Sequence, residues 1–95
     1  MPGNTQHITV GSSQFTQIVA QTQCGEITVG EDPSVNGWPT TDFLVAKPSA
    51  TNTPRRVSAG GTYTFSALGG RYMAGAIAGY VEAVSGATTF FQDEI

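Results

Sequence analysis

Charged side chains are scarce in this 95-residue chain, where they make up 12% of the residues, about half their usual share in a soluble domain. Acidic residues outnumber basic ones, so the net charge is −3 and the isoelectric point is near 4.7. A protein that binds nucleic acid needs a basic surface to contact phosphates, so we expect no nucleic-acid partner. The one basic pair, Arg55-Arg56, is interpreted as a solvated strand end or as half of a salt bridge between subunits.

Cysteine and histidine are also nearly absent. The single Cys24 has no second cysteine to form a disulfide with, and we predict a buried thiol in a reducing cell. The single His7 has no nucleophile motif around it, so an enzyme built on this histidine is the least favoured interpretation. We predict no catalytic residue and no cofactor. Residues 1–5 contain neither a charged nor an apolar region, so we expect no signal peptide and synthesis in a cytoplasm.

A long apolar run is missing as well. Arg71 and Glu82 bracket the most apolar stretch, which is about half the length that a membrane-spanning helix needs. Within it, Gly75 and Gly79 have the spacing of a helix contact motif, but that motif has meaning only in a long apolar helix. Two glycines inside a helix would each cost about 0.5–1 kcal/mol relative to alanine. We therefore expect no membrane partner and favour a strand over a helix.

A hairpin explains this stretch and the residues that follow it. Two strands joined by a turn at Ser85-Gly86 would form four cross-strand pairs, namely Val84–Ala87, Glu82–Thr89, Val81–Phe90 and Tyr80–Phe91. One face of this hairpin would carry Ile77, Val81 and Phe90, and the other would carry Tyr80, Val84 and Phe91. Because both faces are partly apolar, we expect another sheet, the long loops or another chain to cover the second face.

The rest of the chain has the composition of antiparallel β-structure, with threonine for strands and glycine, asparagine and serine for turns. Strands are predicted at residues 6–10, 14–20 with a possible bulge, 24–30, 43–46, around Val57 and at 62–66. The chain is thus predicted to form one all-β domain. We expect a small antiparallel β-sandwich or barrel of the jelly-roll or immunoglobulin-like kind, with a C-terminal hairpin and residues 1–5 as an N-terminal arm.

The polar insertion at residues 31–42 contains a pattern that imitates half of a calcium-binding loop, Asp32-x-Ser34-x-Asn36-Gly37. A calcium loop also requires a glutamate at its twelfth position, and Phe43 occupies that position here. We therefore favour a turn rich in side chain to backbone hydrogen bonds, and predict no metal site.

The single tryptophan, Trp38, lies in the same insertion. If exposed, it would suit a sugar ring or a partner surface; alternatively it folds back and caps the core. Nearby polar side chains that could contact a sugar are Glu31, Asp32, Asn36 and Asp42. A carbohydrate-binding or adhesin-like module is therefore the alternative function.

Two segments, "EDPSVNGWPTTDFLVAKP" and "AGGTYTF…AGAIAGYVEAVSGATTFFQDEI", resemble the small decoration or cement proteins of tailed bacteriophages. The resemblance covers about two-thirds of the chain. It implies a non-enzymatic virion protein on the capsid exterior that binds the major capsid protein or other virion proteins. It also implies a homo-oligomer, with a trimer favoured over a dimer. The predicted packing or interface residues are Trp38, Arg55, Arg56, Tyr80, Phe90 and Phe91.

Overall fold

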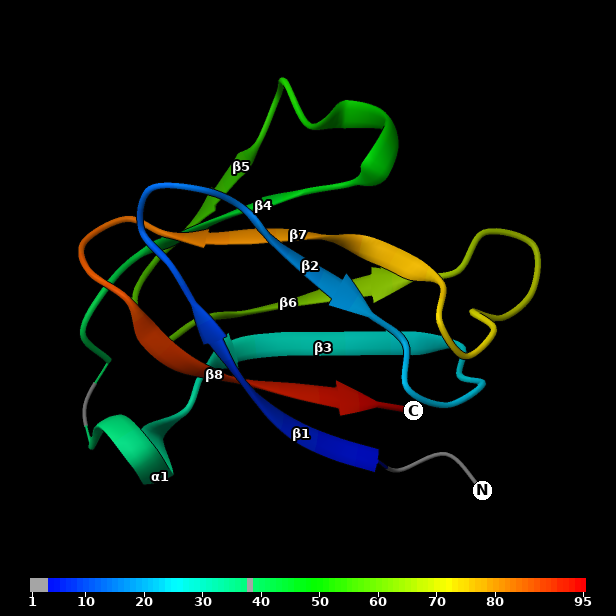
Figure 1. The fold of residues 1–95 in the computed structure, drawn as a ribbon, viewed down its shortest axis with the longest axis horizontal. Helices are drawn as coiled ribbons and strands as arrows, with labels where there is room; N and C mark the ends of the chain where they lie inside the picture. Colours follow the sequence, from blue (N-terminus) through cyan, green and yellow to red (C-terminus); the bar gives the residue numbers. More distant parts are fainter. Residues whose placement is uncertain (1–3, 38) are drawn as a thin grey trace.

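The computed structural model describes residues 4–37 and 39–95 and contains two antiparallel four-stranded sheets packed face to face (Figure 1). This architecture confirms the predicted all-β sandwich. Its strands are β1 (Asn4–Val10), β2 (Thr16–Val19), β3 (Glu26–Glu31), β4 (Phe43–Ala46), β5 (Arg55–Val57), β6 (Thr62–Ser66), β7 (Ile77–Ala83) and β8 (Thr88–Glu94). Two short helical turns, α1 (Pro33–Asn36) and η1 (Pro48–Ala50), lie in the connections. None of the helices in the described ranges has the length and apolarity needed to cross a membrane.

Sheet A has the strand order β1-β8-β3-β6. Strand β1 pairs with β8 along its whole length, and β3 pairs with β8 on one side and β6 on the other. The first strand already begins at Asn4, so the prediction of residues 1–5 as an arm is wrong for Asn4 and Thr5. Residues 1–3 lie outside the described residues.

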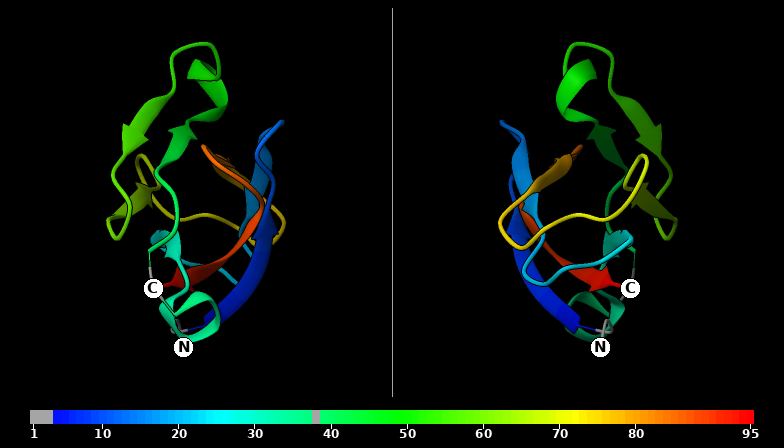
Figure 2. Two further views of the ribbon diagram at one scale, coloured as in Figure 1. Left: turned by 90° about the vertical axis from the view of Figure 1, so that its left-hand side faces the viewer. Right: turned by 90° about the vertical axis from the view of Figure 1, so that its right-hand side faces the viewer.

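Sheet B has the order β2-β7-β4-β5. The register of β2 against β7 shifts between Ile18, which pairs with Gly79, and Val19, which pairs with Ile77. The extra residue, Ala78, therefore lies in β7 and not in the strand for which a bulge was predicted. The β4–β5 hairpin carries η1 at its tip and projects beyond the rest of the sandwich, at the end opposite α1 (Figures 1 and 2).

The core lies between the sheets and follows from strand alternation. Inward-facing residues on β3 and β6, such as Ile27 and Phe65, are fully or almost fully buried, while their neighbours face solvent. At the centre, Phe43 of β4 packs edge-on against Phe90 of β8, with ring centroids 5.0 Å apart. This contact joins the two sheets.

The C-terminal strands exist where they were predicted, but the hairpin does not. Strand β7 lies in sheet B and β8 lies in sheet A, so none of the predicted cross-strand pairs is formed. The connection crosses from one sheet to the other, because the Val84 amide donates to the Asp42 carbonyl and the Ser85 amide donates to the Thr41 hydroxyl. This crossing explains why the segment has apolar residues on both predicted faces, because β7 packs against the core from sheet B and β8 packs against it from sheet A.

Candidate interaction surfaces

The outer side of sheet A is a polar face with few charges. Its outward-facing side chains form the threonine face, which we define as Thr5, His7, Thr9, Glu26, Thr28, Thr62, Thr64, Ser66, Thr89, Phe91 and Asp93. Threonine dominates because its branched side chain fits a half-solvated strand. The hydroxyls of Thr28 and Thr64 share a hydrogen bond of 2.9 Å between neighbouring strands.

Phe91 lies at the middle of the threonine face. It pairs with His7 on one side and with Gly30 on the other. A Cβ at Gly30 would come within 2.8 Å of the Phe91 ring, so the ring lies against this glycine, and Phe91 is half-buried. The position of Phe91 keeps it a candidate interface residue, as predicted.

Tyr80 is the corresponding aromatic residue on the outer side of sheet B. It is half-buried, and its strand neighbours Gly79 and Val81 face the core. It pairs with Ala46 of β4 and with Gln17 of β2. Tyr80 and Phe91 thus place aromatic surface on opposite sides of the sandwich.

The other predicted residues divide into three cases. Phe90 is a packing residue, because it is fully buried against Phe43 and offers no surface to a partner. Arg55 and Arg56 are both exposed on β5. Arg56 forms an ion pair within the chain, with Nη2 2.8 Å from Oδ2 of Asp42. The prediction for Trp38 lies outside the described residues.

His7 and Asp32 form a polar contact at the edge of the threonine face. The His7 Nε2 lies 2.6 Å from Oδ2 of Asp32, and the histidine is largely exposed. The amide and hydroxyl of Ser34 donate to the other oxygen, Oδ1. Hydrogen bonds from Ser34, set against burial, lower the pKa of Asp32. The carboxylate therefore stands between hydroxyl and imidazole, whereas a catalytic triad places the imidazole between them.

The same bonds explain the calcium-like pattern. Asp32 caps the N-terminus of α1, and Gly37 ends the turn with a φ of 83°. The side-chain amide of Asn36 donates to the Thr89 carbonyl. Both carboxylate oxygens of Asp32 are thus used within the chain, as the turn interpretation predicts. Residues 4–37 and 39–95 contain no group of three or more histidine, cysteine, aspartate or glutamate side chains that could hold an ion.

Two buried glutamates, which the sequence interpretation did not recognise as structural, fasten loops to the sheets. Glu94 is fully buried and accepts bonds from the amides of Gln21 and Thr22, the Thr22 hydroxyl and the Gln92 side chain. Glu31 accepts bonds from Thr40 and from the hydroxyl of Thr88. Burial raises the pKa of each carboxyl group, but these hydrogen bonds outweigh it, and both pKa values lie below the usual range.

These carboxylates bear on the sugar-binding alternative. Glu31 and Asp32 are buried and bonded to their own chain, and Asp42 accepts bonds from Arg56 and from the Ala59 amide. Three of the polar groups proposed to contact a sugar are therefore already used. This observation disfavours the alternative without involving Trp38.

No protein-family model and no curated protein matches this sequence. The functional argument therefore rests on the surfaces of the molecule itself.

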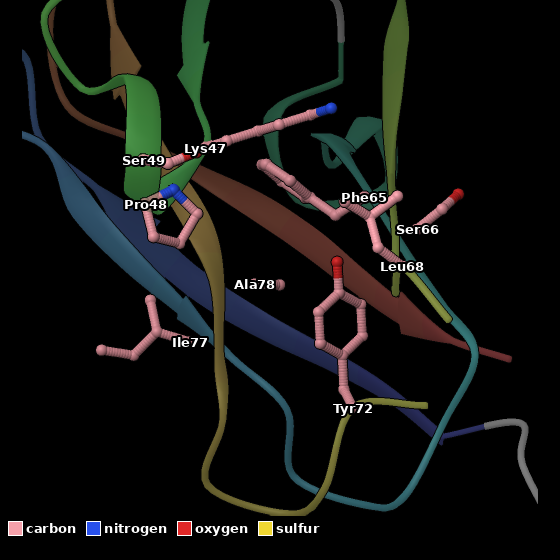
Figure 3. Close-up of a pocket in the computed structure, with 9 residues that line it drawn as sticks. All are labelled: Lys47, Pro48, Ser49, Phe65, Ser66, Leu68, Tyr72, Ile77 and Ala78. Carbon is pink, nitrogen blue, oxygen red and sulfur yellow. The ribbon is translucent and has the colours of Figure 1, made fainter. Parts of the chain in front are cut away.

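Two cavities along β6 form a surface that the sequence interpretation missed. The larger, about 230 Å³, is lined by residues of η1, β6 and β7 and by Tyr72 (Figure 3). The smaller, about 140 Å³, lies between Tyr63, Val45 and Arg55. Lys47 lines both cavities, so we describe the two together as the β6 groove. Its sides come from both sheets.

Charge is segregated around this groove. All four basic side chains, Lys47, Arg55, Arg56 and Arg71, fall within residues 47–71, and no acidic residue occurs between Asp42 and Glu82. In the described ranges, neither Lys47 nor Arg55 forms an ion pair. The groove is therefore positive in a protein that is negative overall. This linear charge pattern is the sequence signal that could have located it.

Proposed function

We propose that this chain is a non-enzymatic structural virion protein, a decoration protein that self-associates and binds the outside of a phage head shell through the major capsid protein. The observation that carries the proposal is the threonine face, with Phe91 at its centre. An interface core is depleted of charge and enriched in aromatic residues. The threonine face has this arrangement around Phe91, because Glu26 lies at the far end of β3 and the one acidic neighbour on the same strand, Asp93, is already hydrogen-bonded to Thr5.

The energetics of such a surface favour association. A threonine hydroxyl costs far less to remove from water than a lysine or glutamate side chain, and its branched side chain has little rotamer freedom to lose. Asp93 already accepts a hydrogen bond from the Thr5 hydroxyl, so its carboxylate has a partner before a second surface arrives. Sparse charge over the whole chain, at 12% of residues, is consistent with a protein that packs against neighbours.

The two aromatic residues on opposite sides suit the two contacts that a decoration protein makes. Phe91 faces out from sheet A and Tyr80 from sheet B. One side can contact the shell while the other contacts a second copy, and we favour a trimer. Buried aromatic residues are the usual energetic centres of protein interfaces.

The test combines light scattering of the purified chain with cosedimentation on undecorated shells. The shells are assembled from the major capsid protein encoded by the same genome. We expect an oligomer that pellets with the shells, and Phe91→Gln should weaken pelleting about tenfold or more, as for a central interface aromatic. The matched control is Val35→Gln, which changes an exposed apolar residue on α1, outside the threonine face, and should pellet normally.

A monomer that does not pellet with these shells would overturn the proposal. Binding on a glycan array that is lost in Trp38→Ala would instead support the carbohydrate-binding alternative. Because the array and the shells are separate measurements, the two results cannot be confused.

A further inference from the structure

The free edge of β6 offers unused backbone hydrogen bonds. Strand β6 is the last strand of sheet A and pairs with β3 alone among the described strands. The Ile95 amide donates to the Glu26 carbonyl, so the backbone of Glu26, and by alternation that of Thr28, points toward β8. Ile27 and Val29 then bond to β6. The backbone groups of their partners, Phe65 and Tyr63, are therefore hydrogen-bonded to β3. Thr64 lies between these two residues, and its N–H and C=O point outward from the sheet edge.

The cavities lie beside this edge at the spacing of a strand. Tyr63 lines the smaller cavity and Phe65 lines the larger one. These residues are two apart on the inward side of β6, which corresponds to about 7 Å along the strand. An extended peptide added beyond β6 has the same repeat, so two of its side chains, two residues apart, would face the two cavities.

The chemistry of the two cavities differs. The larger is lined by apolar groups from Pro48, Ile77 and Ala78, and Figure 3 shows the Tyr72 side chain extending into it. Leu68 at its rim is 93% exposed. Burial raises the pKa of the Tyr72 hydroxyl, which therefore keeps its proton and remains a donor.

The smaller cavity has both Lys47 and Arg55 in its lining. Neither cation has an ion-pair partner within residues 4–37 and 39–95. The larger cavity thus suits an apolar side chain, and the smaller one suits a carboxylate.

We propose that β6 binds an extended peptide segment of another protein, which adds as an antiparallel strand and places an apolar side chain in the larger cavity and an acidic side chain in the smaller one. Because the added strand runs opposite to β6, the recognised pattern is apolar-x-acidic. Main-chain hydrogen bonds to Thr64 supply affinity, and the cavities supply specificity. This inference does not rest on the proposed role at a shell.

Strand β1 is the other edge of sheet A and provides the internal comparison. By the same alternation its free groups belong to Thr5, His7 and Thr9, because Ile8 pairs with Phe90 and bonds to β8. Both cavities lie along β6. Both strands therefore have free backbone groups at an edge of sheet A, but the positive β6 groove lies beside β6.

The test is an NMR titration of the isotope-labelled protein with the peptide acetyl-TFTET-amide. We expect saturable shifts confined to β6 and to the residues of β4, β5, η1 and β7 and the adjoining loops that line the two cavities. The peptide acetyl-TFTKT-amide, in which lysine replaces glutamate, and acetyl-TATET-amide, which lacks the phenylalanine, should both bind more weakly. The Lys47→Gln variant should weaken binding of the first peptide about fivefold, the effect of one exposed ion pair.

Backbone pairing is tested separately from cavity filling. N-methylation of the middle threonine removes the donor opposite Thr64 and should weaken binding about tenfold or more. This measurement uses the unaltered protein, so a folding defect cannot explain it. In the protein, Thr64→Pro should abolish binding, whereas Thr9→Pro, which blocks the free edge of β1, should bind normally.

Three results would overturn the inference. The first is equal binding of the glutamate and lysine peptides, and the second is no loss of binding on N-methylation. The third is a self-association of the unaltered protein that Thr64→Pro abolishes, with no peptide binding, which would assign the β6 edge to a second copy of this chain.

Discussion

The ring of Phe65 in β6 lies directly on Gly79 in β7, so that the two sheets touch where the glycine has no side chain. A Cβ at Gly79 would overlap the Phe65 ring and lie 2.7 Å from the Ala46 carbonyl oxygen. Gly79 is buried, and its φ is not positive. It is therefore required for close approach and not for backbone conformation.

Gly79→Ala should lower the free energy of unfolding by about 1–3 kcal/mol, because the ring and the carbonyl must both move. Urea denaturation measures this change. Gly11→Ala is the matched control, since nothing lies within 4 Å of a Cβ at Gly11, and it should change stability by less than about 0.5 kcal/mol. Equal stability of the two variants would show that Phe65 does not pack on Gly79.

The neighbouring residues Phe90 and Phe91 should respond very differently to truncation. Phe90 is fully buried against Phe43, so Phe90→Ala should cost about 3–5 kcal/mol. Phe91 is half-buried on the outer face, and Phe91→Ala should cost clearly less. Denaturation curves of the two variants check this order, and a larger loss for Phe91→Ala would contradict the assignment of faces.

Glu94→Gln should destabilise the protein by about 1–3 kcal/mol. The substitution places an amide group where the carboxylate accepts bonds from Gln21, Thr22 and Gln92, so one or more donors lose their acceptor. Glu26→Gln is the control, because Glu26 is exposed on its strand. Thermal unfolding at neutral pH compares the two, and similar melting temperatures would refute the proposed role of Glu94.

The stability of the protein should fall on acidification. Hydrogen bonds hold the pKa values of Glu31, Asp32, Asp42 and Glu94 below their usual range. The unfolded chain therefore binds protons first as the pH is lowered. The stabilisation is complete above the ordinary carboxyl pKa of about 4 and is lost as the pH falls through the lower folded values. Melting temperatures across this range measure the loss, and Glu94→Gln should show a flatter dependence.

Cys24 should resist thiol reagents in the native state. It is fully buried, and burial, followed by the negative charge of Glu94, raises the pKa of its thiol. Reaction with a chromogenic disulfide should be at least about 100-fold slower in the folded protein than in denaturant, because it requires opening of the fold. Comparable rates in the two conditions would contradict the buried position.

Local patterns were sufficient to place the strands. The alternation of Glu26 and Thr28 with Ile27 and Val29 predicts one wet and one buried face, and β3 has this arrangement. Tyr63 and Phe65 likewise share the inward side of β6. Such predictions succeed because side-chain alternation is a property of the strand itself.

Strand pairing could not be deduced in the same way. The prediction joined β7 to β8 because they are consecutive and a glycine turn separates them, and consecutive strands are neighbours in most sheets. Here bonds from Val84 and Ser85 to the distant Asp42 and Thr41 direct the chain into the other sheet. Side-chain composition reports how apolar each face is, but it does not report which strand lies beside it.

The sequence by itself determined an all-β domain with sparse charge and with its basic residues confined to one segment. Only the tertiary structure decided which side chains meet around that charge. It brings Lys47, which follows β4, and Arg55 of β5 beside Tyr63 and Phe65 from sheet A. The physical reason is that a groove between sheets depends on contacts far apart in the chain, whereas composition and alternation are local.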